Sequence, residues 1–286
     1  MERLQEAIAK ARAQRDARPS GQTEERVSTS AAGSPLHETP APALPDTVAE
    51  AWQALPELHV DPRRAARNHL VALVGGMGAA EIDGIRTRLL QHLASKGFCK
   101  VAITSPTPGA GKTTLALNLG FSLGRQSDQR TLVADADLRR PQMAKVLGVS
   151  ARHGFGRVLD GTASLSDNAM RVGENLALAT THSPVRNSAE LLQSRQAGTA
   201  LDAIQLQYAP TVMLFELPPM LASDDAMAFL GHMDCALIVA AAERNSTKEV
   251  DRCERDVASQ TTVLGIVLNR CRYMESSDGY VSYYGH

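Results

Sequence analysis

Residues 101–120, VAITSPTPGAGKTTLALNLG, decide the fold. The first four residues form a short apolar run typical of a buried strand, and an amphipathic helical pattern begins at Lys112. Between them lies a loop that contains Gly109 and Gly111. A glycine-containing loop between a strand and a helix can wrap backbone N–H groups around phosphate and direct the start of the helix toward it. The stretch therefore predicts a phosphate-binding turn.

The side chains of this turn have separate predicted roles. Lys112 supplies a positive charge to the β and γ phosphates of a nucleotide, and the Thr113 hydroxyl is placed to ligate Mg²⁺. The common P-loop pattern has glycine at position 106, where this chain has Pro106. The alternative is a Gly-Lys-Thr triplet that only opens an ordinary helix. The predicted nucleotide contacts in the loop are Pro108, Gly109, Ala110, Gly111, Lys112, Thr113 and Thr114.

Apolar runs alternate with helical stretches from residue 100 onward. Alternation of this kind predicts βαβ units and a parallel sheet. The runs are continuously apolar, which is typical of strands that are covered on both faces. The sequence therefore predicts an α/β fold, a P-loop NTPase with a mainly parallel sheet flanked by helices. The predicted strands are residues 101–104, 131–135, 211–215, 235–240 and 263–269.

Acidic residues stand at the ends of two predicted strands. Asp135 and Asp137 are two residues apart, so their side chains would face the same side, and Glu216 ends a later strand. All three would lie near the phosphate loop at the carboxyl end of the sheet. One carboxylate of the pair can hold a metal while the other takes a proton from an incoming hydroxyl. Thr113, Asp135 and Glu216 are the predicted metal ligands; solvated acids at strand ends are the alternative.

The segments outside the predicted core differ in composition. Residues 1–17 read as a short amphipathic helix, and residues 18–50 are rich in Pro, Ser, Thr, Ala and Glu, which predicts a disordered linker. Residues 51–272 form the predicted ATP-binding domain, with mostly helical structure over 61–93. Residues 273–286 are predicted to be a flexible tail, which holds four of the five tyrosines: Tyr273, Tyr280, Tyr283 and Tyr284.

Composition argues against several classes of partner. Thirty basic and 31 acidic residues give a net charge of −1, so no overall field attracts nucleic acid. The four cysteines form no Cys-x-x-Cys pair, which favours reduced thiols and a cytoplasmic location. No apolar run approaches the roughly 18 residues that a membrane-spanning helix needs. We therefore expect membrane recruitment only through a partner.

Four features in order, SPTPGAGKTT, ADADLRRP, FELPP and the tyrosine tail, resemble the bacterial tyrosine autokinases (BY-kinases) of capsule and exopolysaccharide systems. The resemblance runs from about Glu81 to the C-terminus and is greatest to CpsD/CapB-like or exosortase-associated members, within the Mrp/MinD/ParA superfamily. It implies an ATP- and Mg²⁺-dependent kinase domain with Lys112, Asp135 and Asp137 in catalysis. It also implies a homo-oligomer, such as a ring, in which each copy phosphorylates the tyrosine tail of a neighbouring copy. A Wzz-like transmembrane activator or co-polymerase is the implied partner.

This sequence departs from the family pattern at two places. Glu216 stands where the family normally has aspartate. In the helix that usually carries a glutamate and two arginines for oligomerisation, Glu81 and Arg86 are present, but Asp83 stands where the first arginine aligns. Asn269, at the end of the last predicted strand, is in the position where related ATPases touch adenine, although it could equally cap the strand.

Two other functions remain compatible with these motifs. A catalytically weak ATP-binding regulator of a polysaccharide co-polymerase would tolerate Glu216 and Asp83. A partitioning ATPase of the ParA, MinD or Mrp type shares the fold, but those proteins carry an extra lysine near the start of the loop. This chain has Pro106, Thr107 and Pro108 there.

Overall fold

The computed structural model describes residues 47–149 and 154–271. Within these ranges the chain forms a seven-stranded sheet in the order β3-β4-β2-β5-β1-β6-β7, which is parallel except for the antiparallel β3–β4 pair. This confirms the predicted α/β class. The strands are β1 (Lys100–Thr104), β2 (Thr131–Asp135), β3 (Ala169–Val172), β4 (Leu176–Ala179), β5 (Val212–Glu216), β6 (Cys235–Ala241) and β7 (Thr262–Asn269).

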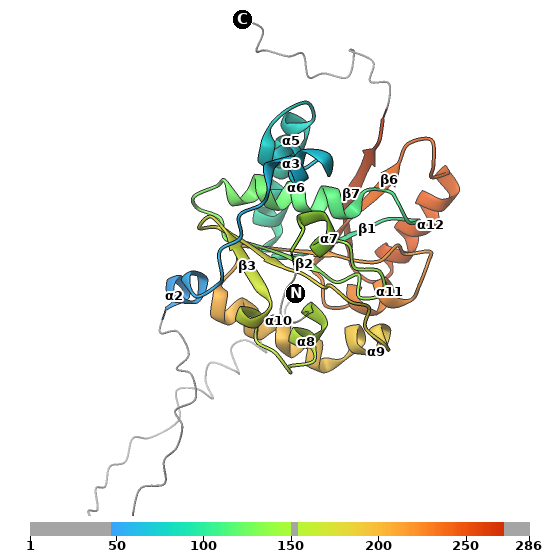
Figure 1. The fold of residues 1–286 in the computed structure, drawn as a ribbon. Helices are drawn as coiled ribbons and strands as arrows, with labels where there is room; N and C mark the ends of the chain where they lie inside the picture. Colours follow the sequence, from blue (N-terminus) through green and yellow to red (C-terminus); the bar gives the residue numbers. More distant parts are fainter. Residues whose placement is uncertain (1–46, 150–153, 272–286) are drawn as a thin grey trace, which may run out of the picture. The chain divides into compact units, whose positions relative to one another are not determined.

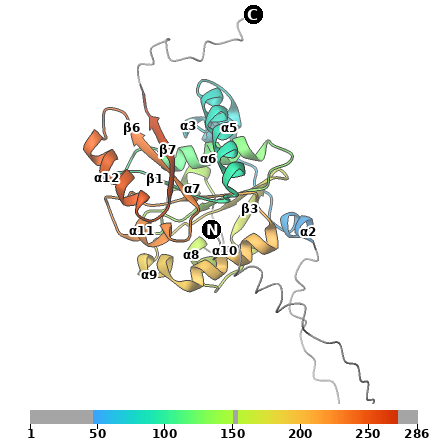
Figure 2. The same cartoon turned by 180° about the vertical axis from the view of Figure 1, so that it is seen from behind.

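Helices cover both faces of the sheet. In Figures 1 and 2, α3, α5 and α6 lie on one side of the sheet and α8, α9 and α10 on the other. The helices of the described ranges are α2 (Val48–Gln53), α3 (Pro62–Arg67), α4 (Val71–Val74), α5 (Ala79–Lys96), α6 (Lys112–Gly124), α7 (Met143–Leu147), α8 (Phe155–Leu159), α9 (Ser188–Gln193), α10 (Arg195–Tyr208), α11 (Asp225–Leu230) and α12 (Thr247–Ala258).

Alternate residues of the central strands enter two separate hydrophobic clusters. In β1, Ala102 joins the cluster under α8, α10 and α11, while Val101 and Ile103 join the cluster under α5 and α6. Phe215 of β5 is fully buried, with its ring centroid 5.5 Å from that of Phe229. Burial on both faces explains why these strands are continuously apolar in sequence. Each fully buried large side chain contributes roughly 1.5–3 kcal/mol to folding.

The five predicted strands are present with boundaries that differ by a residue at most, but the β3–β4 hairpin was missed. Each of its strands has only four residues, and β3 lies at the edge of the sheet with Arg171 half-buried. The helical stretch predicted over 61–93 is divided into α3, α4 and α5. The breaks fall at His69 and at Gly75, Gly76 and Gly78, which all have positive φ.

Residues 47–58 attach to the sheet end that lies opposite the phosphate loop. The Trp52 indole N–H donates to the Tyr208 carbonyl oxygen at 2.7 Å. The Arg171 N–H donates to the Pro56 carbonyl at 2.8 Å, so this segment pairs with β3. Helix α2 begins at Val48, where the Thr47 side chain caps it, so the expected boundary at residue 51 lies three residues late.

Several expectations fall outside the described residues. They are the helix over 1–17, the linker as far as residue 46, and the tail over 273–286 with its four tyrosines. Among the described helices, none has both the length and the apolar character that crossing a bilayer requires.

Candidate functional site

The phosphate loop joins the end of β1 to the start of α6. Gly109 and Gly111 have φ values of 81° and 99°, in the left-handed region that glycine adopts without strain. A Cβ at Gly111 would lie 2.2 Å from Nδ2 of Asn269, so no other residue fits there without movement. Lys112 and Thr113 then open α6, with Lys112 only 7% exposed. The backbone therefore has the form that the sequence predicts for a phosphate cradle.

The strand register brings two of the predicted acids together. Asp135 of β2 pairs with Glu216 of β5, because both end parallel neighbouring strands. The Thr113 hydroxyl donates to Oε1 of Glu216. The Met143 N–H donates to Oδ2 of Asp135 at 3.1 Å. The remaining oxygens, Oε2 of Glu216 and Oδ1 of Asp135, are buried with no hydrogen-bond partner among the described residues.

A pocket of about 550 Å³ opens beside this cluster. Lys112, Thr113, Asp137 and Glu216 line it together with Pro108, Gly109, Gly111 and Thr114 of the phosphate loop. Asp135 is the last residue of β2; it is fully buried and does not line this pocket. Asp137, two residues beyond the strand, does line it. Of the aspartate pair, Asp137 therefore faces the pocket and Asp135 lies behind it.

Burial raises the pKa values of all three acids. The pKa of Glu216 rises to about 7, although Lys112 and the Thr113 hydrogen bond oppose the rise. Burial and the neighbouring Glu216 hold the pKa of Asp135 well above its usual range. Burial also raises the pKa of Asp137, opposed by the Arg140 N–H. Burial thus disfavours the charged form of each acid, and a bound cation would offset that cost.

Mg²⁺ fits this donor set. Glu216, which accepts from the Thr113 hydroxyl, and its strand neighbour Asp135 each have one unpartnered carboxylate oxygen. Mg²⁺ usually binds one or two carboxylates together with nucleotide phosphates and water. Across the described ranges, no group of three or more His, Cys, Asp and Glu side chains could hold a metal on its own. A metal at this site would also take ligands from bound phosphate and water.

The raised pKa of Glu216 predicts how stability changes with pH. Its folded pKa of about 7 exceeds the usual 4.5, so its contribution to stability is complete below about pH 4.5 and is lost as pH rises through 7. In metal-free protein, we expect Glu216→Gln to raise the free energy of unfolding at pH 8 by on the order of 2 kcal/mol and to change it little at pH 5. Urea unfolding at both pH values measures the difference. Glu254→Gln, on the exposed face of α12, is the control, and an equal effect of the two substitutions would contradict the prediction.

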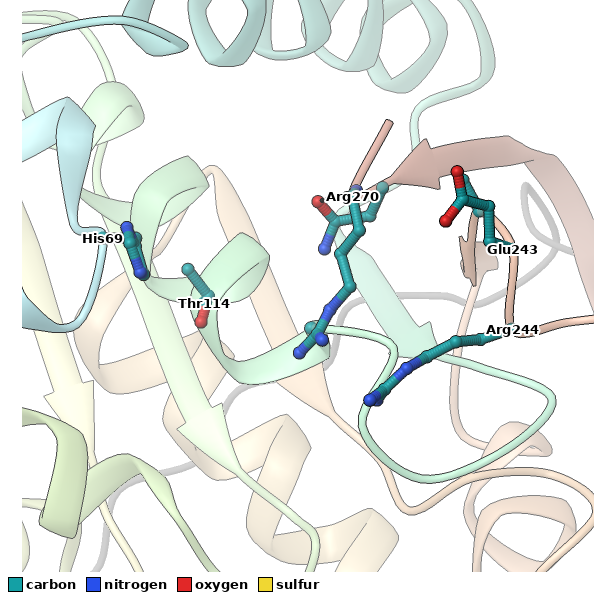
Figure 3. Close-up of a pocket in the computed structure, with 8 residues that line it drawn as sticks. His69, Thr114, Glu243, Arg244 and Arg270 are labelled. Carbon is teal, nitrogen blue, oxygen red and sulfur yellow. Dashed lines mark hydrogen bonds between the residues drawn. The ribbon is translucent and has the colours of Figure 1, made fainter. Parts of the chain in front are cut away.

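A second cavity, of about 600 Å³, adjoins the phosphate loop at Gly111 and Thr114, which also line the first pocket (Figure 3). Asn269 ends β7, and its Nδ2 donates to the Ala110 carbonyl at 2.8 Å. The predicted adenine contact is therefore fixed directly to the loop. Sequence analysis missed the five other lining residues, although a charged residue directly after an apolar strand was a usable signal for Arg270. The lining residues are His69, Gly111, Thr114, Ala242, Glu243, Arg244, Asn269 and Arg270.

An ion pair between a half-exposed arginine and a buried aspartate supports the wall of the first pocket. Arg139, which lines the pocket, donates through Nε to Oδ1 of Asp225 at 2.8 Å. The Ser188 hydroxyl donates to Oδ2 of the same carboxylate at 2.5 Å. Asp225 is fully buried at the start of α11, so it joins α9, α11 and the chain after β2. This contact could not be predicted from the sequence, because Asp225 and Arg139 are far apart along the chain.

The predicted oligomer residues lie on α5. Glu81 is exposed in its first turn. Arg86 donates to Oδ1 of Asp83 at 3.2 Å and to the Ser122 hydroxyl at 3.1 Å. Arg125 of the same chain also pairs with Asp83. Asp83 thus stabilises the packing of α5 on α6 within one chain.

Comparison with known proteins places these features in a family. Residues 101–280 match the CobQ/CobB/MinD/ParA nucleotide binding domain. The tyrosine-protein kinase Ptk of Acinetobacter johnsonii is 29% identical over 70% of this chain, and the aligned region covers 27% of that protein. The tyrosine-protein kinase YwqD of Bacillus subtilis is 27% identical over 70% of this chain and 84% of its own length.

A solved structure agrees with the sequence relatives. The kinase domain of the Escherichia coli tyrosine kinase ETK has a TM-score of 0.63 and 26% identity, over 74% of this chain and 84% of that one. The chain spans only about a quarter of the length of the first curated relatives that it matches. The chain belongs to the CobQ/CobB/MinD/ParA nucleotide-binding domain family and is similar in sequence and fold to the bacterial tyrosine-protein kinases.

Proposed function

We propose that this chain is an ATP- and Mg²⁺-dependent protein-tyrosine kinase that phosphorylates its own C-terminal tyrosines in a neighbouring copy. The observation that carries the proposal is the pocket in which Lys112, Thr113, Asp137 and Glu216 meet beside the phosphate loop. The similarity to Ptk, YwqD and the ETK kinase domain supports the same reaction. The proposed acceptors are Tyr273, Tyr280, Tyr283 and Tyr284.

Each residue has a role that its position supports. Lys112 neutralises charge on the β and γ phosphates. Thr113, Asp135 and Glu216 would hold Mg²⁺, which neutralises charge on the transferring phosphoryl oxygens. Asp137 takes the proton of the tyrosine hydroxyl as the phenolic oxygen forms its bond to the γ phosphorus. The bond from that phosphorus to the β–γ bridging oxygen breaks, and ADP leaves with the electron pair.

Nucleotide position follows from the two adjoining cavities. The triphosphate would lie along Pro108, Gly109, Ala110, Gly111 and Thr114, with the base in the cavity beside Asn269. The anchoring of Asn269 to the Ala110 carbonyl supports this orientation, because it fixes the base contact relative to the phosphate cradle. The purine would then be held at a set distance from Lys112.

The setting we propose is a homo-oligomer at the inner face of the membrane. Glu81 and Arg86 on α5 are the proposed contacts between copies, and Arg86 would exchange part of its bonding to Asp83 for a partner residue. A Wzz-like transmembrane activator or co-polymerase would recruit the kinase in capsule or exopolysaccharide production. One relative, of Klebsiella pneumoniae, is named for a kinase in a cps region, which supports this setting.

A catalytically weak ATP-binding regulator is the second candidate. Glu216 has a longer side chain than the aspartate usual in the family, and it accepts a hydrogen bond from the Thr113 hydroxyl. This bond occupies the hydroxyl group that would otherwise be free to bind the metal. A regulator of this kind would bind ATP and transfer little phosphate.

Mass spectrometry of the C-terminal peptide tests the kinase proposal. Wild-type protein and Lys112→Met, both purified from the native host, are incubated with ATP and Mg²⁺. We expect phosphate on Tyr280, Tyr283 or Tyr284 in the wild type and none in the variant. Unmodified tyrosines in wild-type protein that still binds ATP would favour the regulator instead.

A further inference from the structure

Two arginines reach the nucleotide cavities from the ends of neighbouring strands. Arg244 follows β6 and Arg270 follows β7, and both line the cavity that contains Asn269 (Figure 3). Arg270 also lines the pocket of Lys112 and Thr113. Together with Gly111 and Thr114, it belongs to the boundary that the two cavities share. This boundary lies between the proposed base position and the proposed phosphate position.

The backbone holds Arg270 in an unusual conformation. Its φ is 64°, a left-handed value that side chains other than glycine rarely adopt. Its N–H donates to Oδ1 of Asn269 at 2.9 Å, and Nδ2 of the same asparagine donates to the Ala110 carbonyl. Arg270 is thus fixed to the phosphate loop through a single residue. Strain of this kind is concentrated at functional sites.

The charges of both arginines are available to a ligand. Three arginines elsewhere in the fold are paired with acids: Arg139 with Asp225, Arg86 with Asp83, and Arg171 with Glu57. Within residues 47–149 and 154–271, the guanidinium groups of Arg244 and Arg270 have neither an ion pair nor a hydrogen bond. The phosphate loop itself, residues 105–114, contributes only one cation, Lys112.

Arg244 lies against the loop from the β6 side. A Cβ at Gly109 would be 3.3 Å from its Nη1, so the guanidinium is in contact range of the cradle backbone. The preceding residue, Glu243, has a φ of 60°, which turns the chain back toward the loop directly after β6. Two separate strand ends therefore each bring a guanidinium to the cavity, which the carboxylate of Glu243 also lines.

We infer that Arg270, assisted by Arg244, binds the nucleotide where its nucleoside joins its phosphates. The inference rests on the proposed nucleotide-binding role of this site and deepens it. A nucleotide with its base beside Asn269 and its terminal phosphates at Lys112 must pass the shared boundary that Arg270 lines. A guanidinium presents paired N–H donors that match phosphate oxygens, and such charge-assisted bonds are strong. At this boundary Arg270 supplies a second positive charge for the phosphates, in addition to that of Lys112.

Isothermal titration of the full chain with ADP and with adenosine tests this role. We expect Arg270→Ala to weaken ADP binding about tenfold or more and to leave adenosine binding nearly unchanged. Arg270→Lys keeps the charge but not the paired donors, so its affinity should lie between those of wild type and Arg270→Ala. Arg244→Ala should weaken ADP binding severalfold, and the double variant should bind more weakly than either. The matched control is Arg252→Ala, an exposed arginine on α12 that lines neither cavity.

Each other outcome overturns a stated part of the inference. ADP affinity within twofold of wild type for Arg270→Ala would remove Arg270 from the site. An equal loss for ADP and adenosine would exclude a phosphate contact, and unchanged binding by Arg244→Ala would remove the second arginine. Thermal unfolding of each variant identifies a loss that arises from misfolding. If wild-type protein bound no nucleotide, the proposed function itself would be wrong. That failure is seen in the wild type, whereas failure of the arginine inference is seen only in the variants.

Discussion

Replacing Asp137 by asparagine is expected to reduce the rate of tyrosine phosphorylation by about 100-fold or more while nucleotide binding is kept. Asp137 faces the pocket, and burial raises its pKa, which makes it a stronger base for a phenolic proton. Asparagine has nearly the same shape and retains an oxygen that can accept from the Arg140 N–H, a bond of 3.0 Å in the wild type. The substitution therefore removes the base and preserves the local structure.

Single-turnover phosphorylation of the C-terminal peptide, measured beside ADP titration, separates these effects. Lys112→Met is the comparison, because loss of the lysine charge should weaken both phosphate binding and transfer. A transfer rate for Asp137→Asn within fivefold of wild type would assign the proton to another group. A parallel loss of ADP affinity would instead place Asp137 in nucleotide binding.

Replacing Asp225 by alanine is expected to lower the free energy of unfolding by about 2 kcal/mol. The carboxylate is fully buried and accepts from Nε of Arg139 and from the Ser188 hydroxyl. Its removal leaves the buried Ser188 hydroxyl without this acceptor, which costs more than the lost bonds alone, whereas the half-exposed Arg139 can bind water. Because Arg139 lines the first pocket, we also expect weaker activity at temperatures where the variant is folded.

The adjacent Asp224 provides a matched control for this change. Its side chain is 79% exposed and lies 3.5 Å from Nη2 of the same arginine. An exposed pair of this kind contributes little, so Asp224→Ala should change the free energy of unfolding by less than about 0.5 kcal/mol. Urea unfolding measures both variants. Similar values for the two would show that the buried position of Asp225 has no special energetic role.

The sheet and the core of the site were predictable because they depend on short stretches of sequence. Continuous apolar runs marked the central strands, since burial on both faces leaves no polar alternation. Asp135 and Glu216 were predicted to meet because parallel strands place their carboxyl ends at one edge, and the observed register pairs them. Gly109 and Gly111 identified the loop, since its backbone requires left-handed φ values.

Contacts between distant segments were not predictable in the same way. Asp225 binds Arg139 across 86 positions of sequence, and no pattern in either segment specifies the other. His69 enters the second cavity because its positive φ turns the chain between α3 and α4 toward α6, where Asn118 donates to the His69 carbonyl. The β3–β4 hairpin was missed because four-residue strands carry too little periodicity to distinguish them from loops.

The position of β1 in the sheet has a consequence for synthesis of the protein. Lys100 pairs with Met213 on one side, and Val101 pairs with Cys235 on the other, so both neighbours of β1 lie far downstream in the chain. At ordinary elongation rates, roughly 6–20 seconds pass between the synthesis of β1 and that of β5, its first partner strand. During that interval its apolar side chains and the phosphate loop have no sheet to join. Nascent chains should therefore acquire nucleotide binding only late in translation, and before that point the exposed strand is a natural target for chaperones.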